Sequence, residues 1–415
     1  MSSDSPSITI NCCRSCSSST LLPVVFLGNT PLANALLKSP TLSEPEAVYP
    51  LKLVYCPQCT LLQITDTLTP ESLFREYVYF SSYSDTALEN ARGIVERLIK
   101  DRQLSSQHNV VELASNDGYL LQYYQQHGIP VLGIEPALNI AQVAQAKGVP
   151  TIPEFFGELL AQQLAHERRH ADVIHANNVL AHVADLNSFV AGIAILLKDS
   201  GVAVLEMPYV RDMIDNVEFD TIYHEHLSYF TLHSLDCLFQ RHHLQIVDVE
   251  RLSIHGGSLR LFVQHPDRVP VSQRVRDLLA EEVAGSVDQY EYYRSFGEKI
   301  EQLRHDLLAL LNQLKRDGKQ IAAYGASAKG STLLNYCGIG TETLDFLVDR
   351  SKVKQGLYTP GTHLRIEPVS KLLEAQPDYV LLLVWNFATE ILNQQFEYRT
   401  RGGKFIVPIP NISVV

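Results

Sequence analysis

The sequence has no long apolar run, no excess of positive charge and no dinucleotide-binding glycine motif. No apolar run reaches the roughly 18 residues that a membrane-spanning helix requires, so we expect no membrane partner. The net charge of -12 argues against nucleic-acid binding, which needs a basic face. Residues 1–10 lack the charged and apolar regions of a signal peptide, so we expect a cytoplasmic protein.

The chain has the length and composition of a multidomain globular protein. Its 415 residues are too many for one hydrophobic core, so we expect two or three domains. A hydrophobic content of 46% is enough to give each domain its own core. Short apolar strands alternate with helical segments along most of the chain, and this alternation predicts an α/β fold.

Four of the seven cysteines form two CxxC turns, Cys13 with Cys16 and Cys56 with Cys59. Four thiolates in this pattern are typical of a tetrahedral structural zinc site. An odd number of cysteines in a chain expected to be cytoplasmic also favours metal over disulfides. The alternatives are two unrelated free pairs or a redox CxxC. Four protein ligands leave no open position on the metal, so the predicted zinc stabilises its domain and does no chemistry.

Residues 109–135 predict half of a doubly wound nucleotide-binding fold. A strand ends in the turn Ala114-Ser115-Asn116-Asp117-Gly118, a helix follows, and the next strand ends at Glu135. One glycine does not allow the close backbone approach that a pyrophosphate needs. S-adenosylmethionine carries no phosphate and tolerates side chains in this turn, while Glu135 can accept hydrogen bonds from both ribose hydroxyls. We therefore expect S-adenosylmethionine; a Rossmann-like domain with a closed turn is the alternative.

Polar residues also follow the strand that begins at Ala171. Ligands of an open parallel sheet lie at the carboxyl ends of its strands. Asn177 is therefore a candidate neighbour of the cofactor and His182 of the substrate, with a helix cap or a solvated surface group as the alternative for each. The aromatic connector 76–84, which contains Tyr77, either covers a pocket or packs between domains.

The segment 219–230 contains two histidines, a glutamate and two tyrosines within seven positions, from Tyr223 to Tyr229. Such a density of groups that hold or transfer protons indicates a catalytic site. An extended segment would separate Tyr223 and Glu225 from His224 and His226, whereas a tight loop would let all of them line one pocket. A polar loop between core elements and a metal cluster are the alternatives, but the cysteines supply a metal site elsewhere.

A second Rossmann-like unit is expected after a long helix at residues 290–318. Its first strand leads into the turn 326–331, where Lys329 lies at the position of a phosphate-bearing group. We assign Lys329 to substrate binding; a structural lysine is the alternative. Neither Rossmann unit has the GxGxxG motif, which argues against a nicotinamide-dependent oxidoreductase.

Seven motifs, taken together in this order, resemble the three-domain, zinc-containing sugar-nucleotide C-methyltransferases that make branched deoxysugars. The motifs are the two CxxC pairs, Pro31-Leu-Ala-Asn34, Glu112-Leu-Ala-Ser-Asn-Asp-Gly118, Gly133-Ile-Glu-Pro136, Tyr223-His-Glu-His226, His255-Gly-Gly-Ser-Leu-Arg260 and Tyr324-Gly-Ala-Ser-Ala-Lys-Gly330. The resemblance covers nearly the whole chain. Ala114 is a departure, because the family usually has glycine there.

The resemblance implies three domains and one reaction. The domains are a zinc-binding domain (1–75), a class I methyltransferase domain (76–285) and a Rossmann-like domain that assists sugar-nucleotide binding (286–415). The reaction is transfer of a methyl group from S-adenosylmethionine to the carbon beside the ketone of a nucleotide-linked 4-keto-deoxysugar, typically C3. We expect a monomer or dimer.

The resemblance also assigns the site. A ring carbon becomes nucleophilic only after a base removes its proton and a donor stabilises the enolate oxygen. By similarity, His226 is the base. The supporting catalytic residues are Tyr223, Glu225, His182 and Tyr77; the cofactor residues are Glu112, Ala114, Asn116, Asp117, Gly118, Glu135 and Asn177; His224 and Lys329 are assigned to the substrate. An O- or N-methyltransferase of small molecules on the same fold is the principal alternative, and the cluster around His226 favours carbon.

Overall fold

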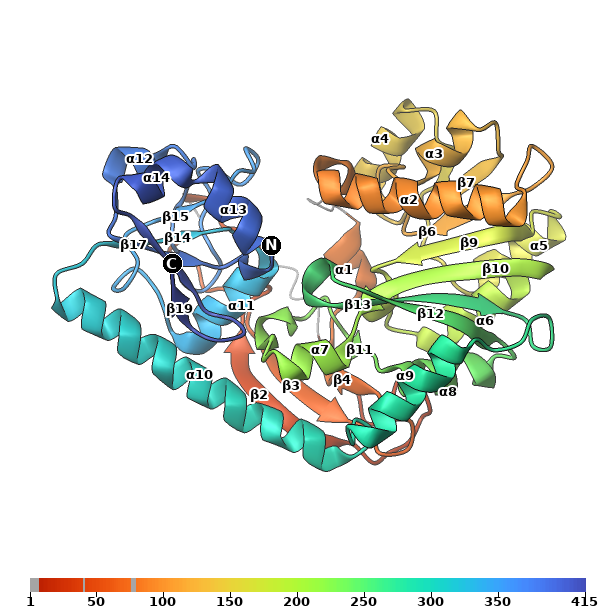
Figure 1. Ribbon diagram of the computed structural model, residues 1–415, viewed down its shortest axis with the longest axis horizontal. Helices are drawn as coiled ribbons and strands as arrows, with labels where there is room; N and C mark the ends of the chain where they lie inside the picture. Colours follow the sequence, from red (N-terminus) through yellow and green to blue (C-terminus); the bar gives the residue numbers. More distant parts are fainter. Residues whose placement is uncertain (1–6, 40–41, 76–79) are drawn as a thin grey trace.

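The computed structural model describes residues 7–39, 42–75 and 80–415, which form three sheet-centred regions (Figure 1). The N-terminal region contains a four-stranded sheet in the order β11-β4-β3-β2 and a small antiparallel pair, β1 with β5. Its strands are β1 (Ile8–Thr9), β2 (Leu22–Thr30), β3 (Tyr49–Tyr55), β4 (Leu62–Ile64), β5 (Asp66–Thr67) and β11 (Ser228–Tyr229). In β3, Leu51 and Leu53 are buried while Pro50 and Lys52 are exposed, the alternation of a sheet with one buried face.

Strand β11 comes from the segment that carries the predicted catalytic residues. It pairs antiparallel with β4 in the register Ser228 with Gln63 and Tyr229 with Leu62. The backbone N–H of Leu227 donates to Ala181 at 2.7 Å. The segment is therefore held between the N-terminal sheet and the central domain.

The central domain is built on a seven-stranded sheet in the order β12-β13-β10-β9-β6-β7-β8. Its strands are β6 (Val110–Leu113), β7 (Val131–Ile134), β8 (Thr151–Ile152), β9 (Ala171–Asn177), β10 (Leu197–Pro208), β12 (Gln245–Leu252) and β13 (Ser258–Gln264). Strand β13 is antiparallel to both neighbours, and the other paired strands run parallel. The carboxyl ends of β6, β7 and β9 therefore meet at one edge, where an open α/β sheet binds its ligands.

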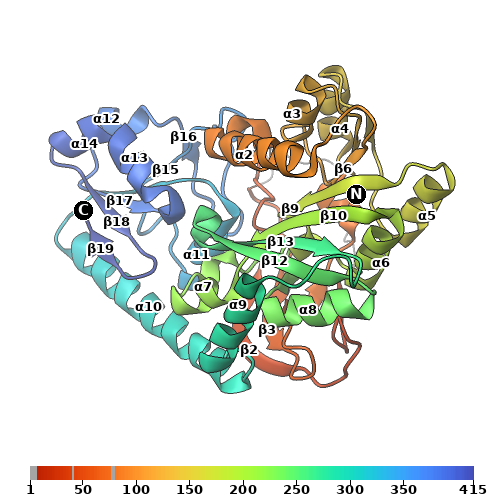
Figure 2. The same ribbon diagram turned by 45° about the vertical axis from the view of Figure 1, so that its right-hand side comes forward.

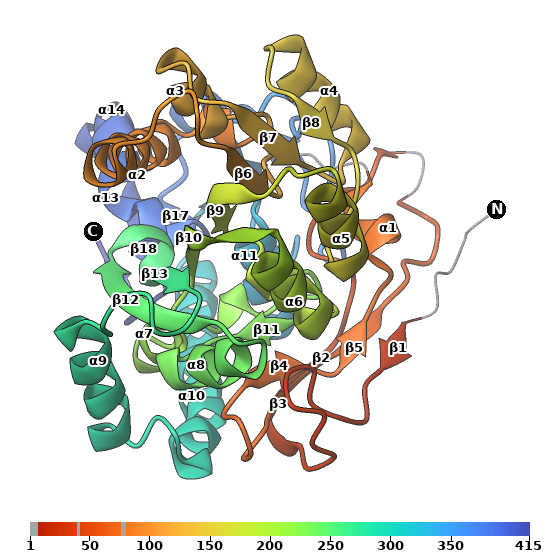
Figure 3. The same cartoon turned by 90° about the vertical axis from the view of Figure 1, so that its right-hand side faces the viewer.

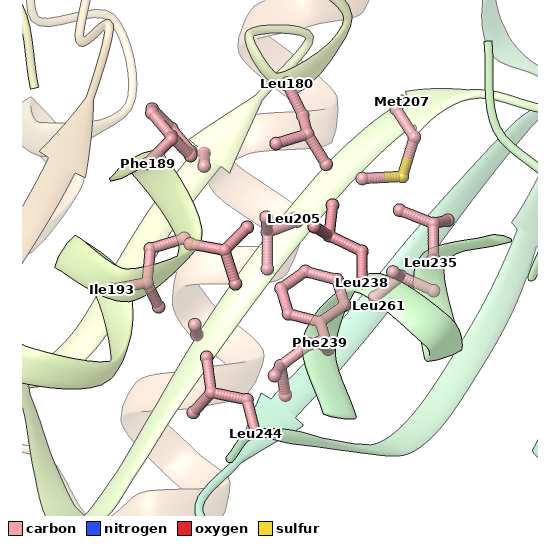
Figure 4. Close-up of a cluster of buried hydrophobic side chains, with 14 of the residues drawn as sticks. Leu180, Phe189, Ile193, Leu205, Met207, Leu235, Leu238, Phe239, Leu244 and Leu261 are labelled. Atoms are coloured by element: carbon pink, nitrogen blue, oxygen red, sulfur yellow. The ribbon is translucent and has the colours of Figure 1, made fainter. Parts of the chain in front are cut away.

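Helices cover both faces of this sheet (Figure 1). One face carries α2 (Asp85–Arg102), α3 (Leu121–Gln126) and α4 (Leu138–Ala146); the other carries α5 (Glu158–His166), α6 (Leu186–Leu196) and α8 (Leu232–Arg241). Figure 4 shows the core between α6, α8 and the sheet, where Phe189, Leu205 and Phe239 pack together. Burial of each such side chain contributes about 1.5–3 kcal/mol.

The C-terminal domain has a six-stranded sheet in the order β16-β15-β14-β17-β18-β19, parallel except for β19. Its elements are β14 (Ile321–Tyr324), α11 (Ala328–Cys337), β15 (Leu347–Val348), β16 (Ile366–Glu367), α12 (Lys371–Ala375), β17 (Tyr379–Leu382), α13 (Ala388–Gln394), α14 (Phe396–Thr400), β18 (Lys404–Val407) and β19 (Ser413–Val414). The Ser327 hydroxyl caps α11 by accepting the Gly330 N–H at 3.0 Å.

Two consecutive helices lead from the central to the C-terminal domain (Figure 2): α9 (Gln273–Ala284) and the 27-residue α10 (Tyr290–Arg316). One stripe of α10 is buried against both the N-terminal and the C-terminal sheet, as the spacing of Ile300, Leu303 and Leu307 predicts. At its N-terminal end, Tyr293 stacks on Tyr55 of β3 with ring centroids 4.6 Å apart.

Figure 3 also shows the short helices α1 (Pro70–Phe74) and α7 (Val210–Asp215). The described 3-10 turns are η2 (Ser81–Tyr83), η3 (Leu180–His182), η4 (Phe219–Thr221), η5 (Ile254–Gly256) and η6 (Trp385–Phe387). Over the ranges that the structure describes, no helix has both the length and the apolar character needed to cross a bilayer.

Candidate functional site

The four cysteines of the two CxxC turns converge. The Sγ atoms of Cys13 and Cys59 lie 3.5 Å apart, as do those of Cys16 and Cys56, and all four lie within 4.8 Å of one another. A tetrahedral zinc ion at a Zn–S distance of about 2.3 Å holds its sulfur atoms roughly 3.8 Å apart. The donor set and its spacing therefore fit zinc with four protein ligands.

The turn after β6 has the backbone shape of a ligand-binding turn. Ala114, Asn116 and Gly118 all have positive φ angles, of 53°, 49° and 78°. Only glycine adopts this region freely, and asparagine tolerates it better than most residues. At Gly118 a β-carbon would also lie 2.8 Å from Val149 Cγ2, so this position requires glycine. Alanine at position 114 adopts the conformation that glycine favours, and its methyl group does not prevent the turn.

Glu135 joins the end of β7 to this turn. Its Oε2 accepts the N–H of Asn116 at 2.8 Å and its Oε1 accepts the N–H of Ala137 at 2.9 Å. Burial raises the pKa of Glu135, and these two N–H donors oppose the shift. Each carboxylate oxygen keeps a further lone pair for a ligand hydroxyl.

Buried polar atoms beside the turn lack partners among the described residues. They are Glu112 Oε2, Asp117 Oδ1 and Asn177 Oδ1. Unsatisfied acceptors in a buried site are costly unless a ligand or water supplies donors. The hydroxyl and amino groups of S-adenosylmethionine are such donors, so the residues fit this cofactor.

The connector before α2 lies against the same turn. The Ser81 N–H donates to Asn116 Oδ1 at 2.8 Å and the Ser82 hydroxyl donates to Asp117. Of the two interpretations of this connector, these contacts favour a cover over the cofactor turn. Tyr77, predicted to support catalysis, lies outside the described residues.

The segment between η4 and β11 is a turn, and this turn brings Tyr223 and His226 together. The His226 N–H donates to the Tyr223 carbonyl at 2.9 Å. The Nδ1 atom of His226 lies 2.9 Å from the Thr221 carbonyl oxygen and its Nε2 lies 2.8 Å from the Tyr223 hydroxyl. A carbonyl only accepts, so Nδ1 carries the proton and the Nε2 lone pair accepts a hydrogen bond from the Tyr223 hydroxyl. His226 is therefore held in the tautomer that a base requires at Nε2.

His182 connects this turn to the cofactor edge of the sheet. It follows β9, and its ring centroid lies 4.8 Å from that of His226 in an edge-on contact. Burial lowers the pKa of His182 to about 4, and a hydrogen bond to the Glu225 backbone opposes the shift. His182 is therefore neutral at pH 7 and does not repel a proton on His226.

A small cavity adjoins His226. Its volume of about 10 Å³ is the size of one water molecule, and Ser228 and Tyr229 also line it. Ser228 Oγ has no hydrogen-bond partner within the described ranges. The cavity therefore suits one bound water and is too small for a substrate.

Glu225 points to the N-terminal domain. It is 5% exposed, and its Oε1 accepts a hydrogen bond of 2.7 Å from Asn34 Nδ2. Burial raises the pKa of Glu225 to about 7, and Asn34 opposes the shift. The group can therefore serve as a proton donor or as a carboxylate near neutral pH.

His224 is not brought to this group. Its Nε2 lies 3.3 Å from the Pro50 carbonyl oxygen and its ring packs edge-on against Tyr49. Burial lowers its pKa. These contacts dock the turn on β3, and His224 Nδ1 is buried with no hydrogen-bond partner among the described residues.

Lys329 lies at the junction of the central and C-terminal domains. Its Nζ is 4.7 Å from the ring centre of Trp385 and is buried with no hydrogen-bond partner in the described part of the chain. The Trp385 indole N–H donates to Asp220 Oδ2 at 2.7 Å. Burial raises the pKa values of Asp220 and Glu218, to about 7 for Glu218, and the charge of Lys329 opposes both shifts. Two carboxyl groups thus share the surroundings of this lysine.

Sequence reasoning did not predict that Asn34 contacts Glu225 or that Trp385 contacts Asp220. Asn34 belongs to one of the seven motifs, and Trp385 is the only tryptophan of the chain. Neither signal indicates the partner, because Asn34 and Glu225 are 191 positions apart and Asp220 and Trp385 are 165 apart.

Three family models match successive parts of the chain. "Putative zinc binding domain" matches residues 13–74, "Methyltransferase domain" matches 81–249 and "C-methyltransferase C-terminal domain" matches 253–410. The chain is 36% identical to C-methyltransferase NovU of Streptomyces niveus over 405 residues, which cover 97% of this chain and 96% of NovU. The predicted α/β fold class and the predicted cofactors, S-adenosylmethionine and zinc, are confirmed.

Solved structures resemble the chain only weakly. Magnesium protoporphyrin IX methyltransferase of Synechocystis PCC 6803 with bound S-adenosylmethionine is 14% identical with a TM-score of 0.34, over 46% of this chain and 85% of its own. The PH0226 protein of Pyrococcus horikoshii OT3 is 14% identical with a TM-score of 0.37, over 45% and 94%. Likeness at this level carries no argument about function.

Proposed function

The chain belongs to the zinc-containing, S-adenosylmethionine-dependent C-methyltransferases, and we propose that its acceptor is a nucleotide-linked 4-keto-deoxysugar, methylated at the carbon beside the ketone. Carbon C3 is our proposed position, in the biosynthesis of a branched deoxysugar. The observation that carries this proposal is the alignment of Thr221, His226 and Tyr223, which supplies a base and a hydroxyl donor side by side.

The proposed reaction begins with removal of the proton beside the ketone. His226 Nε2 takes the proton, and the electron pair of the C–H bond moves into the enolate, whose oxygen bears the negative charge. The Tyr223 hydroxyl, adjacent to Nε2, is placed to donate to that oxygen once substrate separates the two groups. S-adenosylmethionine, when bound, supplies an electrophilic methyl group on a sulfonium sulfur. The enolate carbon would form a bond to this methyl group while the methyl–sulfur bond breaks and its electron pair stays on sulfur, which restores the ketone.

The remaining catalytic assignments concern the surroundings of His226. His182, neutral and in contact with the imidazole, orients it from the end of β9. Glu225 holds or supplies a proton near neutral pH, as its raised pKa allows. Tyr77 stays in the proposal on the resemblance alone.

The cofactor assignment follows the turn after β6. Glu135 receives the ribose hydroxyls. The unsatisfied acceptors of Glu112, Asp117 and Asn177 suit the other donors of the cofactor, and Ala114, Asn116 and Gly118 give the turn its shape. The zinc ligands are Cys13, Cys16, Cys56 and Cys59.

The substrate contacts rest on Lys329. Its buried ammonium group without a hydrogen-bond partner in the described residues supports a contact with the sugar nucleotide. The contacts of His224 with Tyr49 and Pro50 offer no such support. A cytoplasmic location and a monomer or dimer complete the proposal.

The test is turnover with a panel of 4-keto-6-deoxysugar nucleotides in D₂O, with NMR to locate the new methyl group. We expect a methyl group on the carbon beside the ketone, and solvent deuterium entering that carbon without S-adenosylmethionine. A product methylated at oxygen or nitrogen, or a methylated carbon that never exchanges its proton, would overturn the proposal.

A further inference from the structure

The motif Pro31–Asn34 has no function in the reaction described so far. It follows β2 and lies between the C-terminal domain and the turn 221–226, which we call the catalytic turn. Two backbone hydrogen bonds of 2.9 Å join Leu37 to Tyr358. Glu46 accepts the N–H of Gly361 and lies 2.6 Å from His363 Nε2. Contacts with the C-terminal domain thus hold the loop after β2 in place.

Asn34 at the end of this motif reaches the catalytic turn. Its Nδ2 donates to Glu225 Oε1 at 2.7 Å. Glu225 is 5% exposed, and its other carboxylate oxygen has no partner where the structure is described. The hydrogen bond from Asn34 also opposes the effect of burial on the pKa of this carboxyl group. The proton affinity of Glu225 therefore depends on a residue of another domain.

We propose that Asn34 is a positioning residue that fixes the orientation and the proton affinity of Glu225, so that the zinc-binding domain completes the catalytic site. The inference rests on the proposed function, in which Glu225 acts beside His226. An N–H donor stabilises the carboxylate form, and without it burial alone sets the protonation state. An amide suits this place because it brings a donor without the charge that would keep the carboxyl group ionised.

The direct test measures the titration of Glu225 without substrate. Protein labelled with ¹³C at the glutamate carboxyl carbon is titrated by NMR, and the Glu225 signal is the one absent from Glu225→Gln. In Asn34→Leu we expect the Glu225 pKa to rise by about one unit, a tenfold change in proton affinity. In Asn34→Asp it rises further, because two neighbouring carboxyl groups cannot both ionise freely. The controls are Asn29→Leu and Asn29→Asp, at an exposed position of the same domain.

Kinetics supply a second readout. The limb of the pH profile of kcat/KM that depends on Glu225 moves to higher pH in Asn34→Leu. In a protein that already carries Glu225→Gln, adding Asn34→Leu does not shift the pH profile of kcat/KM. A contact that served only folding would lower zinc content or melting temperature and leave the titration of Glu225 unchanged.

The outcomes separate this inference from the proposed function. An unchanged Glu225 pKa in both Asn34 variants, with normal zinc content, would overturn the role of Asn34 even in an active enzyme. If one variant does not fold, the other carries the same measurement. Absence of methyl transfer to every keto sugar nucleotide would overturn the proposed function, while the NMR titration would still decide whether Asn34 controls Glu225.

Discussion

The Tyr223 hydroxyl and His226 Nε2 lie 2.8 Å apart, within one turn of the chain. The Thr221 carbonyl accepts from the opposite nitrogen of the same ring, so the phenol donates to the unprotonated nitrogen. A keto substrate that entered between the two groups would have its acidic C–H at the imidazole and its carbonyl oxygen at the phenol. In the proposed reaction, this one pair of residues would supply both requirements of enolate formation.

Replacement of the imidazole tests the base. We expect His226→Asn to lower kcat by about 10² to 10⁴, the usual contribution of a general base. Binding of S-adenosylmethionine, measured by calorimetry, should stay within about twofold, because the cofactor turn lies on β6 and β7. The control is His243→Asn, at an exposed site whose φ of 55° asparagine tolerates. Near-normal turnover in His226→Asn would remove this residue from the role.

Removal of the phenol hydroxyl tests the donor. In Tyr223→Phe we expect kcat to fall by about 10- to 100-fold with little change in KM, because the hydrogen bond strengthens as charge develops on the enolate oxygen. Deuterium exchange into the substrate should fall by the same factor, since both reactions share the first step. Exchange at the wild-type rate would leave Tyr223 with no part in that step.

The buried Glu225 carboxyl group makes stability depend on pH. Burial raises its folded pKa to about 7 from an ordinary value of 4.5, so the folded state keeps a proton that the unfolded state releases. Its contribution therefore decreases as pH rises from about 4.5 to 7, by about 3 kcal/mol at 1.36 kcal/mol for each pKa unit.

Glu225→Gln removes this dependence. Relative to wild type, we expect the variant to gain up to about 3 kcal/mol in unfolding free energy between pH 5 and pH 8, measured by urea denaturation. The comparison cancels other titrating groups such as Glu218. Glu154→Gln, at an exposed position, is the matched control and should show no such trend. If the difference in unfolding free energy between Glu225→Gln and wild type did not change with pH, the raised pKa of Glu225 would be contradicted.

Loss of zinc is expected to disturb the structure of the catalytic turn. Cys56→Ser removes one thiolate, so we expect zinc content measured by mass spectrometry to fall well below one per chain. Turnover should be lost with the zinc, because β11 pairs with β4 of this domain and Asn34 contacts Glu225. Binding of S-adenosylmethionine should persist. The exposed Cys12 offers the control Cys12→Ser, which should keep both zinc and activity.

Full activity of a zinc-free Cys56→Ser protein would contradict this coupling. Loss of cofactor binding together with turnover would show instead that the whole chain unfolds.

The sequence by itself determined the features that depend on short stretches of chain. The spacing of the two CxxC turns specified the metal, and one glycine beside Asn116 and Asp117 excluded a dinucleotide and indicated S-adenosylmethionine. Both features depend only on local sequence, because the residues of a turn and their neighbours in sequence determine which groups face the ligand. The density of proton-carrying residues at Tyr223–His226 likewise indicated a candidate catalytic segment.

Tertiary structure alone decided how that segment works. An extended segment would have separated Tyr223 from His226, whereas the turn, whose C-terminal end is held by Ala181 and by β4, brings them together. The same docking turns His224 into the N-terminal sheet and Glu225 toward Asn34, 191 positions away. No local pattern encodes such a contact, because it depends on how distant parts of the chain pack around one turn.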